Sequence, residues 1–296
     1  MSHATVQATA LPAACWQVGG GVVSLSRPRI MGIVNVTPDS FSDGGQHFDA
    51  TRAIEHGLRL AAEGADILDI GGESTRPGAA EVDVEEELAR VLPVIRGLRG
   101  TGLPLSVDTS KPEVMRAALD AGAAIVNDVR ALLVPGAIEV VQASDCGVVL
   151  MHMQGAPRSM QADPRYDNVV AEVRAFLMSR AAACEAAGIA RARIVLDPGY
   201  GFGKTLEHNL ALLAGQGHLA ASGYPLLAGL SRKSMLGAIT GRPARERAVA
   251  SAAAALIAVQ RGASIVRVHD VAATVDAIKI WQAIREADQQ EPGGSG

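Results

Sequence analysis

The stretch that decides the fold is LPLSVDTSKPEVMRAALDAGAAIVND, residues 103–128. It begins with an apolar run that ends at Asp108 and continues as a helix-like segment with Pro112 in its first turn. It finishes with a second apolar run that ends at Asn127 and Asp128. Strand, helix and strand in this order form a βαβ unit, which joins two parallel strands. The stretch therefore predicts a parallel sheet covered by helices.

The same unit recurs along the chain. Eight short apolar runs end at or near a polar residue, namely Asn35, Asp69, Asp108, Asn127, His152, Asp197, Ser231 and His269. The first and last of these are 234 residues apart, so seven steps average about 33 residues, the size of one βαβ unit. Helix-like segments lie between most of the runs, at 51–65, 82–100, 111–123, 166–188 and 244–263. In the first of them, Gly64 is placed to end the helix.

Eight strands that alternate with helices predict an α/β protein with a (β/α)₈ barrel, the TIM barrel, because eight is the count that closes a parallel sheet. An open doubly wound sheet is the alternative, but it would gather its ligands at one switch point. Here polar residues end all eight runs, which favours the barrel.

The chain divides into three predicted parts. Residues 1–27 form an N-terminal extension in which WQVGGGVVSLS, residues 16–26, reads as a β-hairpin that covers the N-terminal end of the barrel. Residues 28–286 form the barrel. Residues 287–296, which end in EPGGSG, form a disordered tail.

Composition narrows the class of protein. The 296 residues carry a net charge of −4 and only 3% aromatic residues, which argues against nucleic-acid binding and favours small-molecule partners. Three cysteines without a C-x-x-C pair argue against a disulfide framework or a zinc site. No secretory leader or apolar stretch of membrane-spanning length is present, so we expect a soluble, cytoplasmic protein that does not enter a membrane.

Polar residues at the strand ends predict a site at one mouth of the barrel, because the chemistry of this fold sits at the C-terminal ends of its strands. Asp108, Asn127 and Asp197 offer hydrogen-bond acceptors and an amide donor, which suit a flat heterocycle that carries N–H groups and an exocyclic amine. Asp108 could instead cap the helix that follows it.

Cations near the last two strand ends suit an anion. Arg267 and His269 are two residues apart in a strand, so both side chains point to one face and could bind phosphate, or could be a solvated pair. Lys233, in SRKSM at residues 231–235, follows the seventh strand, where this fold often binds phosphate, although a solvated loop lysine is the alternative.

One further motif and one histidine receive no role in the predicted site. GYGFGKT, residues 199–205, fails as a P-loop because Pro198 stands where the first glycine is needed, so nucleotide hydrolysis is rejected. His152 lies among methionines and reads as a packed residue. A metal ion should be bound by oxygen, and Mg²⁺ is expected if a pyrophosphate is held.

The motifs NVTPDSFSDGG, DIGGESTRPGA, SVDTSKPEV, NDV, LMHMQGAPRSMQ, LDPGYGFGKT, GLSRKSM and VRVHDV follow one another in this chain. In order and spacing they resemble the dihydropteroate synthase family, over residues 28–285. The resemblance implies the joining of 6-hydroxymethyl-7,8-dihydropterin pyrophosphate to 4-aminobenzoate, with release of pyrophosphate, in folate biosynthesis. It also implies a homodimer. Tyr200 departs from the phenylalanine common in this family.

The resemblance further implies a role for each matching residue. The pterin pocket would consist of Asp108, Asn127, Asp197 and Lys233. The pyrophosphate would be bound by Arg76, Arg267 and His269, and Asn35 would help to bind Mg²⁺. The aminobenzoate site would be bordered by Thr75, Pro77, Phe202 and Ser234. The residues that take part in catalysis would be Asp108, Lys233, Arg267 and His269. The loops 37–45 and 71–79 would close over the substrates.

The implied chemistry breaks a carbon–oxygen bond to an anionic leaving group, which Arg267, His269, Arg76 and Mg²⁺ would assist. The electron-rich pterin can share the remaining positive charge, so departure can precede attack by the neutral arylamine. Two alternatives are a methyltetrahydrofolate-binding methyltransferase and a non-catalytic pterin-binding paralogue. Intact loop motifs and the Arg267–His269 pair favour the synthase.

Overall fold

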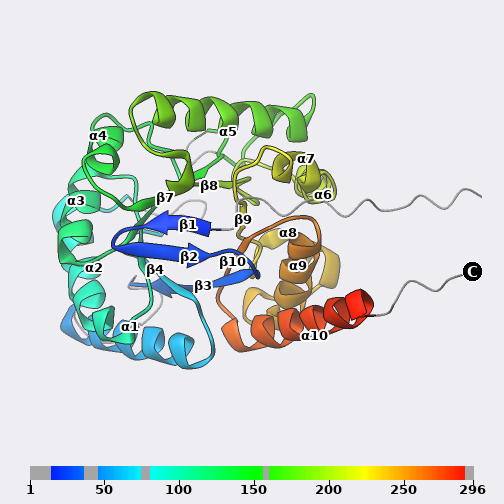
Figure 1. Ribbon diagram of the computed structural model, residues 1–296, viewed down its shortest axis with the longest axis horizontal. Coiled ribbons are helices and arrows are strands. Elements are labelled where there is room, and N and C mark those ends of the chain that lie inside the picture. The colour runs from blue at the N-terminus through cyan, green and yellow to red at the C-terminus, as the bar shows by residue number, and fades with distance from the viewer. Residues whose placement is uncertain (1–14, 37–45, 75–80, 156–159, 291–296) are drawn as a thin grey trace, which may run out of the picture.

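The structure, a computed structural model, describes residues 15–36, 46–74, 81–155 and 160–290. The strands are β1 (Cys15–Val18), β2 (Gly21–Ser24), β3 (Arg29–Asn35), β4 (Ile67–Gly71), β5 (Leu105–Asp108), β6 (Ile125–Asp128), β7 (Gly147–Met151), β8 (Ile194–Asp197), β9 (Leu227–Ala228) and β10 (Ile265–Val268). The α-helices are α1 (Gln46–Ala62), α2 (Val84–Leu98), α3 (Pro112–Ala121), α4 (Ala137–Gln142), α5 (Val169–Ala186), α6 (Leu206–Ala214), α7 (Gln216–Ala220), α8 (Ser234–Thr240), α9 (Ala248–Gln260) and α10 (Val271–Gln290). Figure 1 labels these elements.

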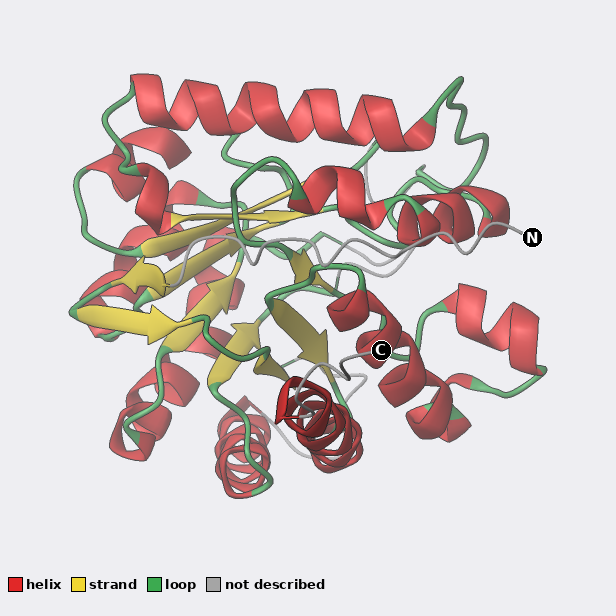
Figure 2. Ribbon diagram, turned by 45° about the vertical axis from the view of Figure 1, so that its right-hand side comes forward, coloured by secondary structure: helices red, strands yellow, loops and turns green. Residues whose placement is uncertain are grey.

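The larger sheet closes on itself. Strands β3 to β10 pair in parallel in the order β8-β7-β6-β5-β4-β3-β10-β9. At the two ends of this order, the backbone N–H of Leu196 in β8 donates to the carbonyl of Pro225 at 3.0 Å, and Leu196 bridges to Leu226, next to β9. Helices surround the strands (Figure 2). The predicted (β/α)₈ barrel is confirmed, and the doubly wound alternative is excluded.

Successive residues of each strand face opposite sides of the sheet. The inner layer of the barrel consists of Met31, Ile67, Ile125, Val149, Val195, Leu227 and Ile265, which pack together and are buried. Residues next to them, such as Val126 and Val266, face the helices and join the larger core between sheet and helices. Both faces are therefore apolar, which is why the strands read in the sequence as continuous apolar runs.

The predicted hairpin forms and covers the N-terminal end of the barrel. β1 and β2 pair antiparallel, with Trp16 opposite Val23. Trp16 is fully buried, packs with the inner layer of the barrel, and donates its indole N–H to the carbonyl of Arg193 at 2.8 Å. Gly147, at the start of β7, leaves room for it, since a Cβ there would lie 2.9 Å from the indole. Figure 1 shows the hairpin in blue in front of the larger sheet.

Local signals begin and end several helices where the sequence indicates. Asp83 caps α2 by accepting the N–H of Glu86 at 2.8 Å. Pro112 is the first residue of α3, and Gly64 follows α1 with φ of +102°, a backbone that favours glycine. The last helix, α10, runs to Gln290, past the predicted barrel boundary at residue 286. The segment EPGGSG lies outside the described residues.

Candidate active site

Two predicted site residues, Asp108 and Asn127, are connected to the guanidinium of a third, Arg267, Asp108 directly and Asn127 through Asp69. Arg267, in β10, donates from Nη2 to Asp108 Oδ2 in β5 at 2.6 Å and from Nε to Asp69 Oδ2 in β4 at 2.5 Å. Asn127, in β6, donates from Nδ2 to the same oxygen of Asp69 at 3.0 Å. Arg267 is therefore not a solvated strand-end charge. Asp108 is not a helix cap either, because the N-cap residue of α3 is Lys111.

Burial sets the electrostatics of this group. The side chains of Asp69, Asp108 and Arg267 are 0%, 10% and 20% exposed. Burial raises the pKa of Asp108, and the Arg267 guanidinium opposes the rise. Although burial opposes it, the carboxylates of Asp69 and Asp108 raise the pKa of Arg267 above its ordinary value. Arg267 therefore stays charged, in a setting where its interactions are little screened by water.

A second pair of predicted residues lies at the end of β8 and just before α8. Asp197, 5% exposed, accepts the N–H of Gly199 with Oδ1 at 2.7 Å. Lys233 donates from Nζ to the carbonyl of Tyr200 and lies 4.6 Å from the ring centroid of Phe202. Burial lowers the pKa of Lys233 to about 8, against the attraction of Asp197. Lys233 is thus held against Tyr200 and Phe202 and is not a solvated loop lysine.

The segment before Lys233 is held to the end of β10. The Ser231 hydroxyl lies 3.1 Å from the backbone nitrogen of His269 and 3.0 Å from its Nδ1. The next residue, Arg232, has φ of +58° and forms an ion pair with Asp270 at 2.6 Å. A left-handed backbone at a residue other than glycine is uncommon and clusters at functional sites. The contacts of Ser231 and Arg232 therefore fix where His269 and Lys233 lie.

GYGFGKT folds around its own lysine. Lys204 is 3% exposed and donates from Nζ to the carbonyls of Gly199 at 2.8 Å and Phe202 at 3.0 Å. Gly199 has φ of +67°, and a Cβ there would lie 1.8 Å from the carbonyl oxygen of His152. This lysine therefore binds backbone carbonyls inside the protein.

His152 is packed, as expected. It is buried, contacts the ring of Phe176 edge-on at 5.0 Å, and lies with Nδ1 3.0 Å from Lys204 Nζ. Burial and the nearby Lys204 lower the pKa of His152 to about 3, so the imidazole is neutral.

Tyr200, which stands where phenylalanine is common in the family, packs into the core between sheet and helices. Its ring is fully buried, and its hydroxyl donates to Gln216 Oε1 at 2.8 Å. We expect Tyr200→Phe to lower the free energy of unfolding by about 1 to 2 kcal/mol, because the buried Gln216 oxygen loses its donor. The kinetic constants should not change. Urea unfolding and steady-state kinetics on the same preparation test this, and a fall in kcat at unchanged stability would contradict it.

The other predicted residues are less fully described. Asn35 is the last residue of β3, half-buried, and follows the inward-facing Met31 and Ile33 at intervals of two. Phe202 is half-buried and Ser234, the first residue of α8, is exposed. Thr75, Arg76, Pro77 and the loop 37–45 lie outside the described residues, as does most of the loop 71–79. Within the described part of the chain, no cluster of three His, Cys, Asp or Glu side chains could hold a metal ion.

The sequence placed Asp69 and Ser231 near the mouth but assigned neither of them an individual role, and the structure connects both to the site. Asp69 read as a strand-end residue, yet it lies inside β4 and binds Arg267 and Asn127. An acidic residue within an otherwise apolar run was the available signal. Ser231 carried a weaker signal, a hydroxyl next to two cations.

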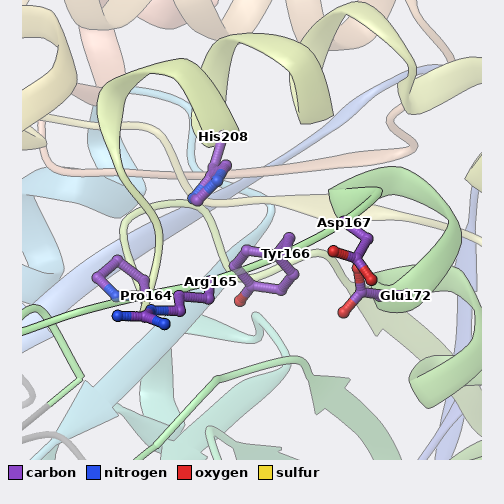
Figure 3. Close-up of a pocket in the computed structure, with 6 residues that line it drawn as sticks. All are labelled: Pro164, Arg165, Tyr166, Asp167, Glu172 and His208. Atoms are coloured by element: carbon purple, nitrogen blue, oxygen red, sulfur yellow. The ribbon is translucent and has the colours of Figure 1, made fainter.

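A separate hollow of about 550 Å³ lies outside this group, between the segment before α5 and the start of α6 (Figure 3). Its lining residues are Pro164, Arg165, Tyr166, Asp167, Glu172 and His208. Tyr166 donates to the carbonyl of Gly203 at 2.8 Å, and His208 forms a capping box with Thr205 at the start of α6. These polar groups serve the local fold, and none of the predicted site residues lines the hollow.

Comparison with known proteins identifies the class. A family model described as pterin binding enzyme matches residues 31–269, which is most of the chain. The chain is thus a pterin-binding barrel.

Individual relatives are more specific. A dihydropteroate synthase of Neisseria meningitidis serogroup C is 55% identical over 274 residues, which cover 91% of this chain and 97% of that protein. The structure of Xanthomonas albilineans dihydropteroate synthase with 4-aminobenzoic acid superposes with a TM-score of 0.87 at 56% identity and covers 95% of this chain and all of that one. The Burkholderia cenocepacia enzyme complexed with 7,8-dihydropteroate has the same TM-score and coverage at 51% identity.

The chain therefore belongs to the dihydropteroate synthase family, which makes it a transferase of folate biosynthesis. The function expected from its motifs is confirmed, and the methyltransferase and the non-catalytic paralogue are not supported.

Proposed function

We propose that the barrel mouth binds the dihydropterin through Asp108, Asn127, Asp197 and Lys233, and joins it to 4-aminobenzoate bordered by Phe202 and Ser234. The proposal rests on the ion pair between Arg267 and Asp108, which lies beside Asn127. One group thereby combines acceptors for the N–H groups of a heterocycle with a cation for its pyrophosphate. Thr75, Pro77 and Arg76 keep the roles that the resemblance implies.

The charge of the group favours departure of the pyrophosphate before attack. Asp108 and Asp197, both largely buried, place two carboxyl groups at the pterin end of the pocket. Such a pocket stabilises positive charge on the pterin methylene carbon. Arg267 and His269 would stabilise the oxygen that leaves. The aminobenzoate amine, neutral at pH 7, needs orientation more than a base.

Mg²⁺ is part of the proposal. Asn35 carries one amide oxygen at the end of β3, on the inward side of the strand by alternation, and a single protein oxygen fits an ion that takes its other ligands from pyrophosphate and water. When bound, the ion would neutralise charge on the leaving group. Asn35 would hold it at the same mouth as Arg267.

The direct test follows pyrophosphate release from the pterin pyrophosphate with and without 4-aminobenzoate, together with detection of dihydropteroate. Release coupled to dihydropteroate formation supports the proposal. Pterin binding without turnover would contradict it and would make methyltetrahydrofolate the next substrate to test.

Activity should depend on pH through Lys233. Burial lowers the pKa of Lys233 from its ordinary 10.5 to about 8, so its charge is lost as pH rises through 8. Because kcat/KM reports the unliganded enzyme, we expect kcat/KM for the pterin substrate to fall above pH 8. Lys233→Arg keeps its charge over this range and should abolish the fall. A fall that persists in Lys233→Arg would show that another group titrates.

The assembly and location are also proposals. On α9, Val249, Ala253 and Ile257 recur at intervals of four and are exposed, Val249 to 83%. The opposite side of α9, including Ala254, Ala255 and Ala258, packs into the core. An exposed apolar stripe on a packed helix supports a homodimer, which sedimentation can test.

Within the described residues no helix is long and apolar enough to cross a membrane. Cys15, Cys146 and Cys184 are unpaired, which supports a cytoplasmic location.

A further inference from the structure

Asp69 lies below the substrate-facing residues of the mouth. In the register of β4 and β5, Asp69 is opposite Ser106, whereas Gly71 is opposite Asp108. Asp69 is therefore one inward-facing position deeper in the barrel than Asp108. Its side chain is fully buried, and it reaches the site only through other residues.

One oxygen of Asp69 holds two residues of the site. Oδ2 accepts Nε of Arg267 at 2.5 Å and Nδ2 of Asn127 at 3.0 Å. The bond from Asn127 fixes which way its amide is turned, because Nδ2 faces Asp69 and the amide oxygen faces away from it. The bond from Arg267 fixes the guanidinium plane, since Nη2 is bound at the same time by Asp108.

The other oxygen of Asp69, Oδ1, binds neither Arg267 nor Asn127. Among the described residues Oδ1 is buried without a hydrogen-bonding partner, as is the hydroxyl of the neighbouring Ser106. A buried carboxylate with an unsatisfied oxygen costs stability, and an apolar residue would pack there at lower cost. Folding stability therefore does not explain why position 69 carries a carboxylate.

We infer that Asp69 is a positioning residue that orients Asn127 and Arg267 together, so that the pterin and its pyrophosphate are bound in one geometry. Asn127 thereby presents its amide oxygen to an N–H group of the heterocycle. Arg267 presents its guanidinium beside the same ring. The inference rests on the proposed roles of Asn127 and Arg267.

Asp69→Asn tests this, because its uncharged amide oxygen holds the Arg267 guanidinium and the Asn127 amide less firmly than the carboxylate oxygen does. We expect kcat/KM for the pterin pyrophosphate to fall on the order of 30-fold, and binding of inorganic pyrophosphate measured by calorimetry to weaken. The KM for 4-aminobenzoate at saturating pterin substrate should not change. Ser106→Ala is the matched control, since it alters a buried polar group on the same inner face that binds neither residue, and it should leave all constants unchanged.

A double variant separates positioning from general damage. If Asp69 acts through Arg267, Asp69→Asn combined with Arg267→Lys should lose less than the product of the two single losses. Multiplicative losses, or an equal loss in the constants of both substrates, would overturn the inference. If Asp69→Asn fails to fold, the same kinetic and calorimetric measurements are made on the smaller Asp69→Ser. The wild-type assay run alongside shows separately whether the proposed synthase reaction occurs.

Discussion

Arg267→Ala is expected to lower kcat/KM for the pterin pyrophosphate by roughly two to three orders of magnitude, on the order of 3 kcal/mol of transition-state stabilisation. The guanidinium is the cation proposed to meet the charge that develops on the leaving pyrophosphate. It is held ready by two carboxylates, so little reorganisation is needed when the bond breaks. Steady-state kinetics with the pterin substrate varied at saturating 4-aminobenzoate gives the loss.

The variant has a second consequence that must be measured with the first. Without Arg267, Asp69 and Asp108 remain close together in a buried site without their shared counter-ion, which costs stability. Rates should therefore be normalised to the folded fraction from thermal unfolding. Arg261→Ala is the control, because Arg261 donates to the carbonyl of Ala214 at an exposed position away from the mouth. Unchanged turnover and pterin binding in Arg267→Ala would refute the role of Arg267.

The second large effect is expected for Asp197→Asn. The N–H of Gly199 binds Oδ1 of Asp197 at 2.7 Å and requires an acceptor at that position. The amide oxygen of the variant must stay there, which turns its NH₂ group toward the ligand. Donors of the pterin would then face a donor, and we expect pterin affinity to fall about 100-fold or more.

Calorimetric titration with the pterin alone measures this effect, since it needs neither Mg²⁺ nor the second substrate. The Gly199 contact survives, so the thermal midpoint of Asp197→Asn should stay close to that of the wild type. Asp163→Asn is the matched control on an exposed loop residue, 67% exposed, and should bind pterin normally. Normal pterin affinity in Asp197→Asn would remove Asp197 from the pterin pocket.

The strand runs were visible in the sequence because a barrel strand is buried on both faces, and a continuous apolar run carries that signal. The same property concealed which residues face inward. Asp69 read as the polar end of its run, whereas pairing with β5 puts it inside β4, beneath Asp108. Register is decided between strands, so one strand by itself does not contain it.

The residues that begin and end several helices were also visible in the sequence. Pro112 begins α3 and Gly64 follows α1 because their backbone preferences act within a few residues. The short helices α4, α7 and α8 were not predicted, although Gly241 ends α8 with φ of +70°. Tyr200 shows the same limit for side chains, since only the fold reveals that its hydroxyl is bound to Gln216.

The sequence by itself determined the barrel class, the hairpin extension and the family, since apolar periodicity and motif order are properties of the chain. Only the tertiary structure decided how the site is connected. That Arg267 lies between Asp69 and Asp108, that Ser231 holds His269, and that Lys233 binds the carbonyl of Tyr200 all depend on contacts between strands far apart in the chain. Closure of the sheet brings these residues within hydrogen-bonding distance, and no local preference encodes it.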